Sequence, residues 1–594
     1  MGRKSLAAIL LSLAAVATVS PACAACQLVK LGELPVTMEG LSPVIPAKIN
    51  GKDARLVADT GAFFSALSRS EIEPLHLSVR ELPSGLIFKG ATGEFSGGLV
   101  QAEDFTVLNH TFKRVQFITV NDQFGAGTIG LLGQNFLNIV DTEYDLANGS
   151  IRLFHPDGCA TSALAYWAAG KPSSVIPIDA VSDSQRRIHG SVTVNGVTLS
   201  TMFDTGFPYS ELTIHGASRI GIKRGDPRLT PAGSTRGVAG GIVQSWTGPV
   251  DSFKIGDEEI KYTRLRMAEI EVDGADMVLG ADFFLSHRIL VANSQRKLYF
   301  SYNGGPVFKL ESADGGGQAP PVEDAQRIGA DAADTPKDAA GFIRRAHAFK
   351  ARRQYAQAIA DFSQAITLSP MDAKPLYDRA MVHVAEHQDD KALTDLDAAL
   401  QLKPDDTDAL LMRGLLHLRG KRLERAKADL QAVVRQDPKY ALEVSDIYTD
   451  GQAYAEAIAV LDSWIAASPK DQNLATGLNN RCWTRALWDR ELDKALADCD
   501  AALKARPGTT SFLDSRGLVY LRMGRFDAAI RDYDVVVRKA PLLAWSRYSR
   551  GVGKLRAGQT EQGQADIKAA IGIDADVVAK AKARGLAPAL ASQP

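Results

Sequence analysis

The sequence predicts a multidomain protein in which two all-β lobes precede an all-α repeat array. A strand-rich unit occurs twice before residue 302, and a regular helical repeat begins near residue 339. The 594 residues also exceed what one hydrophobic core can hold. A formal net charge of −1, without a basic cluster, gives no reason to expect nucleic acid or an anionic membrane as a partner.

Residues 1–25 have the pattern of a secretory signal peptide. Two basic residues precede an apolar stretch at residues 6–19, and small residues follow just before residue 25. We expect cleavage there and export across the inner membrane into the periplasm. The residues before Cys23 and Cys26 fit a lipid-attachment motif poorly, so no lipid anchor is expected. No later stretch suits a transmembrane segment.

The two β lobes are predicted at residues 26–160 and 172–302. Both contain short runs of β-branched and aromatic residues separated by glycine, and few windows have a helical period. Asn50-Gly51 and Asn195-Gly196 each lie between two such runs, where Asn-Gly is a hairpin signal. Each lobe is therefore predicted to be all-β.

An Asp-Thr-Gly triplet stands at the same place in both lobes. Asp59 and Asp204 each lie nine residues after the Asn of the shared Asn-Gly pair. An apolar-apolar-Gly segment follows each triplet at a similar distance and contains Gly133 in the first lobe and Gly280 in the second. One carboxylate at the same place in each copy predicts two carboxylates that meet across a pseudo-twofold axis.

Such a pair has a defined chemistry. Two carboxylates about 3 Å apart cannot both ionise, so they share one proton. The ionised member takes a proton from water while the protonated member polarises a peptide carbonyl. This chemistry needs no cofactor and no metal, and the 10 histidines have no zinc-ligand spacing. We therefore expect neither a cofactor nor a metal.

The order of these motifs resembles the retropepsin-like aspartic protease family, in its bacterial branch, over about residues 30–160 and 175–302. The resemblance implies that Asp59 and Asp204 form a catalytic dyad that acts on a polypeptide substrate. It also implies a set of residues that support the active-site loops: Thr60, Gly61, Thr205, Gly206, Gly133 and Gly280.

Two features leave alternatives open. The glycine-rich stretches at residues 88–98 and 237–242 suit flaps over an extended peptide, but plain surface hairpins suit them equally. The family usually has Ala or Ser after the triplet; Ala62 fits, whereas Phe207-Pro208 does not. Phe207 either narrows the cleft or marks a second lobe retained only for its fold.

Residues 303–338 are predicted to be a flexible linker because they are rich in small and acidic residues and poor in large apolar ones. A helical repeat with a capping helix is predicted at residues 339–585. Prolines recur there at a nearly constant interval: Pro370, Pro404, Pro438, Pro469, Pro507 and Pro541. An Ala followed four residues later by a larger residue precedes each. This pattern resembles the tetratricopeptide repeat (TPR), which implies a protein partner on the concave face.

Four cysteines remain after the predicted cleavage, an even number that suits two disulfides in an exported protein. Cys26 and Cys159 bracket the first lobe, so a bond between them would join its two ends. Cys482 and Cys499 fall on facing helices of one repeat. We predict these two pairings.

The favoured hypothesis is an exported, aspartic-type endopeptidase with both catalytic aspartates in one chain and a repeat array that recruits a protein substrate or partner. The alternative is a catalytically inactive, peptide-binding scaffold of the cell envelope. In a third arrangement, each lobe pairs with its mate in another chain.

Overall fold

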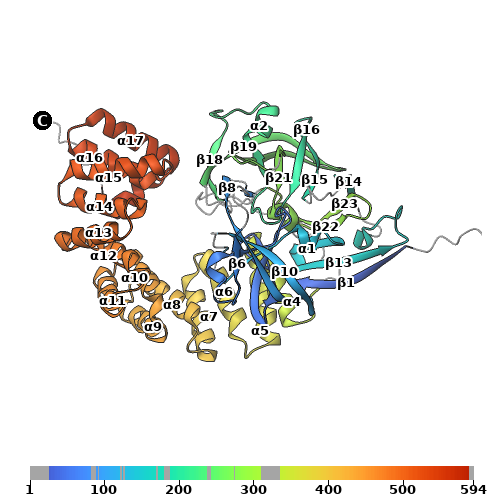
Figure 1. Cartoon of the computed structure of the whole chain (residues 1–594), viewed down its shortest axis with the longest axis horizontal. Helices are drawn as coiled ribbons and strands as arrows, with labels where there is room; N and C mark the ends of the chain where they lie inside the picture. The colour runs from blue at the N-terminus through green and yellow to red at the C-terminus, as the bar shows by residue number, and fades with distance from the viewer. Residues whose placement is uncertain are drawn as a thin grey trace, which may run out of the picture.

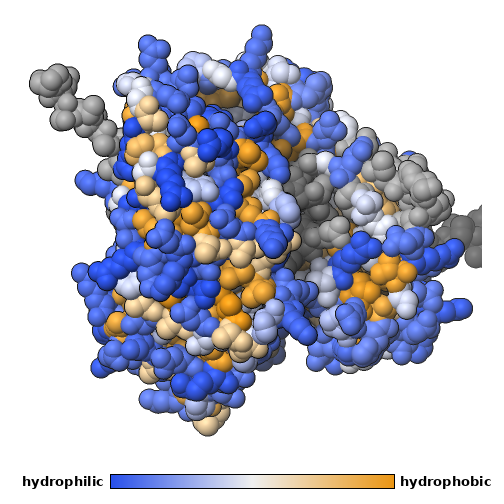
Figure 2. Space-filling view, turned by 60° about the vertical axis from the view of Figure 1, so that its left-hand side comes forward, coloured by the Kyte–Doolittle hydropathy of each residue, from blue (hydrophilic) through white to orange (hydrophobic). Residues whose placement is uncertain are grey.

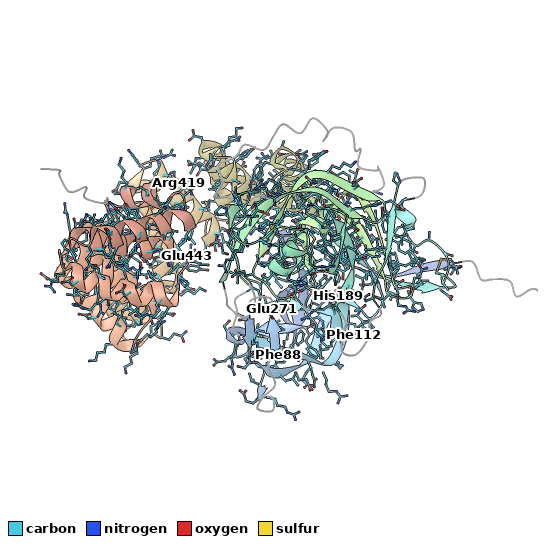
Figure 3. All side chains as sticks on the ribbon, turned by 90° about the horizontal axis from the view of Figure 1, so that it is seen from above. Phe88, Phe112, His189, Glu271, Arg419 and Glu443 are labelled. Atoms are coloured by element: carbon cyan, nitrogen blue, oxygen red, sulfur yellow. A yellow bond between two sulfur atoms is a disulfide. The ribbon has the colours of Figure 1, made fainter. Side chains whose placement is uncertain are left out.

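The computed structural model describes residues 26–81, 88–90, 93–120, 124, 127–168, 172–179, 187–236, 242–272, 274–308 and 335–586. The predicted signal peptide lies outside the described residues. The two β lobes lie side by side, and the helical array passes beneath lobe 1 and curves upward, so that the lobes lie on the inner side of the curve (Figure 1). Seen from above, Phe88 and Phe112 mark lobe 1 and His189 marks lobe 2 (Figure 3).

Lobe 1 is a closed barrel. Its strands are β2 (Thr37–Glu39), β3 (Ser42–Ile49), β4 (Lys52–Ala58), β5 (Ala66–Ser68), β6 (Val79–Glu81), β9 (Gly98–Val107), β10 (His110–Val120) and β11 (Gly130–Leu132). Their order is β2-β3-β4-β11-β5-β10-β9-β6, and β3 also pairs with β9, which closes the sheet. The stretch predicted as a flap or a hairpin contains β7 (Phe88–Gly90) and β8 (Gly93–Phe95), which pair with each other.

Lobe 2 repeats this barrel. Its strands are β15 (Ile188–Val194), β16 (Val197–Phe203), β17 (Glu211–Thr213), β18 (Thr230–Arg236), β19 (Ile242–Ile255), β20 (Glu258–Ala268) and β21 (Met277–Leu279). Their order is β15-β16-β21-β17-β20-β19-β18, and β15 also pairs with β19. Residues 237–241 of the second predicted flap lie outside the described residues. The prediction of two all-β lobes is confirmed, with closed barrels.

A third sheet joins the lobes. It contains β1 (Gln27–Pro35), β12 (Asp141–Asp145), β13 (Ser150–Asp157), β14 (Ser174–Pro177), β22 (His287–Ala292) and β23 (Lys297–Tyr302). The order is β1-β13-β12-β22-β23-β14, so each lobe contributes one half and β12 pairs antiparallel with β22 at the centre. The buried carboxylate of Glu143 bonds Arg288 across this seam at 3.0 Å. Backbone pairing and a buried ion pair thus hold the lobes together.

Short helices interrupt the lobes: α1 (Gln134–Leu137), α2 (Ile214–Arg219), α3 (Ala281–Ser286), and the 3-10 turns η1 (Arg69–Glu71), η2 (Leu146–Asn148) and η3 (Tyr166–Ala168). Helices α1 and α3 begin directly after Gly133 and Gly280, at equivalent positions of the two lobes. They lie next to the two Asp-Thr-Gly loops.

The rest of the described chain is helical. Its helices are α4 (Ala339–Ala351), α5 (Tyr355–Leu368), α6 (Ala373–Ala385), α7 (Asp389–Leu402), α8 (Thr407–Arg419), α9 (Leu423–Gln436), η4 (Pro438–Tyr440), α10 (Ala441–Asp450), α11 (Tyr454–Ala467), α12 (Leu474–Trp488), α13 (Leu492–Ala505), α14 (Thr510–Arg522), α15 (Phe526–Lys539), α16 (Ala544–Arg556), α17 (Thr560–Ile573) and α18 (Val577–Ala583). Consecutive helices pack as antiparallel pairs, and the predicted solenoid is confirmed. On the face shown in Figure 2, small hydrophobic patches alternate with hydrophilic residues.

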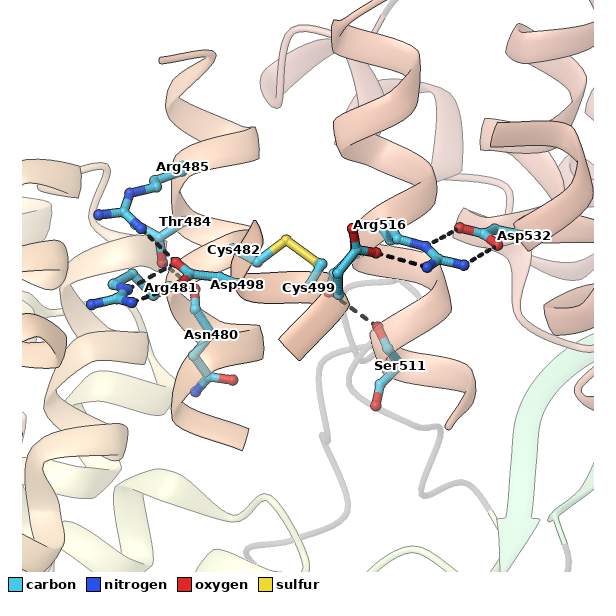
Figure 4. The surroundings of a disulfide bond; sticks show 12 residues. Asn480, Arg481, Cys482, Thr484, Arg485, Asp498, Cys499, Ser511, Arg516 and Asp532 are labelled. Atoms are coloured by element: carbon cyan, nitrogen blue, oxygen red, sulfur yellow. Dashed lines mark hydrogen bonds and ion pairs between the residues drawn. A yellow bond between two sulfur atoms is a disulfide. The ribbon is translucent and has the colours of Figure 1, made fainter. Parts of the chain in front are cut away.

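A ladder of arginines and aspartates links the repeats. In the third repeat, the Arg413 guanidinium bonds Asp429 of its own helix pair and Asp397 of the preceding one, both at 2.7 Å. Arg516 repeats this pattern with Asp532 at 2.8 Å (Figure 4). Each arginine therefore ties one repeat to the next as well as closing its own.

The first helix of the array packs on lobe 1. Helix α4 contacts β2 and η2, and Ala348 belongs to the hydrophobic core of the lobes. Ala348 and Val382 occupy equivalent positions of consecutive repeats, and Val382 packs into the core of the repeat before its own. The first repeat has no predecessor, and lobe 1 covers this face instead. Lobe 1 thus acts as the N-terminal cap that a solenoid needs.

Both ends of the predicted linker, residues 303–338, are attached to the neighbouring domains. Phe308 packs on Phe253 of lobe 2, with ring centroids 4.8 Å apart, so the first residues of the predicted linker belong to the lobe's core. Asp338 caps α4, because its side chain accepts a hydrogen bond from the Gly341 amide at 2.7 Å. Residues 309–334 lie outside the described residues.

Two disulfides are present. Cys26 bonds Cys159 across a separation of 133 residues, and Cys482 bonds Cys499 across 17 residues (Figure 4). The first joins the two ends of lobe 1, and the second joins α12 to α13. Among the described residues, none of the helices has the length and apolar character needed to cross a membrane.

Candidate active site

The two Asp-Thr-Gly loops occupy equivalent places in the two barrels. Asp59 follows β4 and Asp204 follows β16, and each of these strands pairs in parallel with a short strand of its own barrel, β11 or β21. The backbone N–H of Asp59 donates to Leu132 O at 3.0 Å, and that of Asp204 donates to Leu279 O at 2.9 Å. The apolar-apolar-Gly segments therefore fix where both aspartates leave their strands.

The threonines lock the two loops together. The Thr60 hydroxyl accepts the Thr205 amide at 2.9 Å, and the Thr205 hydroxyl accepts the Thr60 amide at 3.1 Å. Each hydroxyl also donates across the lobes, Thr60 to Phe203 O at 2.8 Å and Thr205 to Ala58 O at 2.6 Å. Both side chains are fully buried. These four bonds hold the loops in one rigid unit across the pseudo-twofold axis.

The glycines let the carboxyl groups meet. A Cβ atom at Gly61 would stand 1.9 Å from the Asp204 carboxyl, and one at Gly206 would stand 2.4 Å from that of Asp59. The two carboxyl groups hydrogen-bond each other, and both belong to one chain. The structure therefore brings together the pair singled out in the sequence, without a second copy of the chain.

The two carboxyl groups have unequal surroundings. Asp59 Oδ1 accepts the amides of Gly61 at 2.9 Å and Ala62 at 2.8 Å. Asp204 Oδ1 accepts only the Gly206 amide, at 2.8 Å, among the described backbone donors. The next amide in lobe 2, that of Phe207, donates to the Asp204 backbone carbonyl instead, at 3.2 Å. Backbone donors favour an ionised carboxylate, so Asp59 is the better place for the negative charge.

Burial raises the pKa of both carboxyl groups, and the contact between the two groups makes their pKa values differ. The pKa of Asp204 lies well above its usual range, because the negative charge of Asp59 adds to burial. The pKa of Asp59 is raised by burial, while the hydrogen bond from Asp204 and the two amides oppose the rise. The pair therefore holds one proton, carried by Asp204, over a range of pH.

Gly133 and Gly280 lie against the loops, where a side chain would not fit. A Cβ atom at Gly133 would stand 2.8 Å from Ala62 O, and one at Gly280 would stand 2.6 Å from Phe207 O. Ser65 and Ser210 hold the same places in the two lobes, and their hydroxyls accept the Gly133 and Gly280 amides, each at 3.0 Å. These contacts attach each loop to the start of α1 or α3.

The residue that holds each serine differs between the lobes. In lobe 1, Asn135 Oδ1 accepts the Ser65 amide and hydroxyl, both at 2.8 Å. In lobe 2, Asp282 Oδ1 accepts the Ser210 amide at 2.9 Å and hydroxyl at 2.6 Å. Burial raises the pKa of Asp282 to about 6. These four residues were not predicted from the sequence, although both acceptors stand at the same offset from Gly133 and Gly280.

Phe207, which departs from the family pattern, is buried. It is 7% exposed and packs in a small cluster with Met202 and Val278 under the second loop. Ala62 holds the same place in lobe 1 and packs with Val57 and Leu131. The large side chain thus fills the interior of lobe 2 beside its loop.

One cation near the pair was not expected from the sequence. Arg187 precedes β15 in lobe 2, and its Nε donates to Gly61 O of lobe 1 at 2.7 Å. Its charge acts on both carboxyl groups and lowers the pKa of each. No local pattern around Arg187 could indicate this, because the contact depends on how the two lobes meet.

Comparison with protein families agrees with this geometry. A family described as aspartyl protease matches residues 45–136 and 190–283, one match in each lobe. A family described as tetratricopeptide repeat matches residues 343–407, 377–441, 411–472 and 486–544. The fold and the family match therefore define two aspartyl-protease-like domains in tandem. The helical part that follows them is a tetratricopeptide-repeat array.

Some solved structures resemble part of the chain. A tetratricopeptide repeat protein from Parabacteroides merdae shares 17% identity with a TM-score of 0.34, over 42% of this chain and 98% of that one. PilW, a type IV pilus biogenesis factor, shares 16% identity with a TM-score of 0.28, over 34% of this chain and 93% of PilW. No curated protein sequence gave a significant match.

Proposed function

We propose that this protein is an exported aspartic-type endopeptidase. The single observation that carries the proposal is the hydrogen-bonded pair of Asp59 and Asp204, held by the threonine contacts between the two lobes. A rigid pair of carboxyl groups that shares one proton is suited to activate water against a peptide carbonyl. Such chemistry needs neither a covalent intermediate nor a metal.

The surroundings of the pair suggest separate roles. Asp59, with two amide donors, is the base that takes a proton from the attacking water. Asp204, with the higher pKa, donates its proton to the carbonyl oxygen as the tetrahedral intermediate forms. As the C–N bond breaks, the proton taken by Asp59 passes to the leaving amine, and one hydroxyl of the intermediate returns its proton to Asp204, which restores the pair. The threonine contacts hold the carboxyl groups of Asp59 and Asp204 in place, so the two groups need not move during the reaction.

The rest of the chain supports export and a protein ligand. Two disulfides favour an oxidising compartment such as the periplasm, where the predicted signal peptide would deliver the chain. Tetratricopeptide repeats bind proteins, and the inner side of the curved array faces the lobes (Figure 1). We propose that the array brings a polypeptide substrate, or a partner that carries it, to the site.

Substitution of either aspartate tests the proposal. Asp59→Asn and Asp204→Asn should each reduce cleavage of unfolded casein at least about 1,000-fold between pH 4 and 7, since neither variant can share a proton. Asp53→Asn is the control, because that side chain is 88% exposed and lies outside the site. Full activity in either variant of the pair would show that the shared dyad is not the catalyst.

Buried Phe207 favours the alternative function, a peptide-binding scaffold in which lobe 2 is catalytically inactive. In lobe 1 the equivalent amide, that of Ala62, bonds the catalytic carboxylate, whereas the Phe207 amide does not. A pepstatin-type inhibitor separates the two functions. It should raise the melting temperature of the wild type, and Asp204→Asn should abolish that increase. Peptide binding without cleavage, and without an inhibitor effect, would favour the scaffold.

A further inference from the structure

Arg187 breaks the symmetry of the two lobes beside the carboxyl pair. It lies eight residues before Asn195, and the position eight residues before Asn50 in lobe 1 is Ser42. Ser42 pairs with Glu39 in a hairpin of lobe 1. The duplication therefore placed similar strands in both lobes, while a cation stands at this position in lobe 2 alone.

The contact of Arg187 crosses from one lobe to the active-site loop of the other. Its Nε donates to Gly61 O, and the Gly61 amide donates to Asp59 Oδ1 at 2.9 Å. Gly61 also lies directly against the Asp204 carboxyl. The guanidinium is thus separated from the pair by one glycine and reaches both carboxyl groups by its charge.

We propose that Arg187 is a positioning residue of this site: it clamps the first active-site loop from lobe 2 and balances the single negative charge of the pair. This inference rests on the proposed function and adds a device that sets the pH range of activity. Arginine suits the role because it remains charged at every relevant pH.

The direction of the effect follows from charge. The doubly protonated pair is neutral, the active pair carries one negative charge, and the fully ionised pair carries two. A fixed cation favours each more negative state over the one before it, so it moves both ionisation steps to lower pH. Tyr144 also faces the pair, but burial and the charge of Asp59 raise its pKa above the usual range, so it stays neutral.

The pH profile of kcat/KM tests the inference in the full-length protein. Arg187→Gln should move both limbs of the profile for an internally quenched peptide pool upward by about one pH unit. Arg187→Lys keeps the charge, so its limbs should stay near those of the wild type, although the lost bond to Gly61 lowers the rate. A Gln variant that is slower at every pH with unmoved limbs would overturn the inference, as would a Lys variant that shifts like Gln.

A second measurement needs no activity. Because the pKa of Asp204 is raised in the folded state, the stability that this carboxyl group contributes is lost as pH rises from about 4, and the difference in melting temperature between the wild type and Asp204→Asn reports it. Arg187→Gln raises this pKa further, so the loss should continue to higher pH and the Gln variant should fall increasingly below the wild type there, and Asp204→Asn should remove the difference. If the curves shift in this way but no variant cleaves peptide, the proposed function fails and the role of Arg187 stands. Parallel curves for Gln and wild type would refute that role.

Discussion

Asp282 and Asn135 hold the same place in the two lobes, yet only Asp282 titrates. Both accept the amide and the hydroxyl of a serine beside the Asp-Thr-Gly loop. Asp282 is 2% exposed, and burial raises its pKa to about 6. The lobes therefore use the same bracket with a neutral acceptor in one and an ionisable acceptor in the other.

We predict that Asp282→Asn stabilises the protein at pH 7. The folded acid holds its proton above the pKa of the unfolded chain, so its contribution to stability is lost as pH rises from about 4 to about 6. Asn removes this loss, at most about 3 kcal/mol, and keeps both serine bonds as in lobe 1. Urea unfolding at pH 4 and pH 7, followed by tryptophan fluorescence, measures the difference.

Asn135→Asp is the reciprocal variant. It should be less stable than the wild type at pH 7 and close to it at pH 4, because it places an acid at the equivalent position of lobe 1; the loss should be smaller than about 3 kcal/mol, since Asn135 is only partly buried. Equal stability of Asp282→Asn and wild type at both pH values would contradict the argument.

We predict that Gly61→Ala inactivates the site. Its Cβ would stand 1.9 Å from the Asp204 carboxyl, so that carboxyl must move away from Asp59. A misplacement of about 1 Å costs on the order of 100-fold in rate, and cleavage should fall at least that much. Gly572→Ala is the control, because no atom lies within 4 Å of the added carbon there. Normal cleavage by Gly61→Ala would mean that the carboxyl groups need not touch.

Among single residues, the sequence predicted those that recur at the same place in both lobes, and it did not predict contacts between one lobe and the other. Asp59 and Asp204 could be singled out because the duplication repeats their offset from Asn-Gly. Arg187 could not, because it occurs in one lobe and its partner, Gly61, is 126 residues away. The unequal donors to the pair also escaped prediction, since they depend on the backbone around Phe207.

At the scale of the elements, the fourth repeat of the array lacks the arginine–aspartate pair found in the third. When the repeats are aligned on Pro438 and Pro469, the places of Arg413 and Asp429 are taken by Val444 and Val460. The arginine–aspartate pair is thus replaced by two valines in one repeat, where Val444 is fully buried. A buried ion pair and an apolar pair of similar volume often give similar stability.

We predict that Arg413→Val alone destabilises the array by about 2–3 kcal/mol, because it leaves Asp429 with 5% exposure and no guanidinium. The double variant Arg413→Val with Asp429→Val should recover most of this loss. Helical circular dichroism in urea, read as a double-mutant cycle, gives the coupling between the two sites. Additive losses would mean that the valine pair of repeat four depends on its own surroundings.

The helical elements were predictable because a TPR is local: each helix packs on its neighbours, so the same pattern recurs in every repeat. The strands of the lobes were predictable in kind but not in pairing. Strand β12 of lobe 1 pairs with β22 of lobe 2 to form the sheet between the lobes. No local signal reports a contact between segments so far apart in the sequence.

At the scale of the whole molecule, the array and the lobes form a single packed body. Gly149, at the end of η2, lies so close to α4 that a Cβ there would stand 2.6 Å from Arg344 Cβ. Arg352 is 5% exposed and donates to Gly304 O at 3.1 Å, and burial lowers its pKa to about 10. The sequence indicated a linker between the two parts but could not indicate this seat.

The contact between α4 and lobe 1 predicts that the lobes and the array stabilise each other. Ala348→Glu puts a charge into the core shared by α4 and lobe 1, which costs several kcal/mol if the contact is kept. The array should therefore detach from lobe 1. Small-angle scattering should show a larger radius of gyration, and the melting temperature of the lobes should fall because β2 and η2 lose their cover. Ala360→Glu, on the exposed face of α5, is the control and should change neither.

If cleavage of casein also falls in Ala348→Glu while cleavage of a short peptide persists, the fixed position of the array is what delivers large substrates to the aspartate pair. Equal loss with both substrates would place the effect in the lobes, and an unchanged radius of gyration would contradict the capping role of lobe 1.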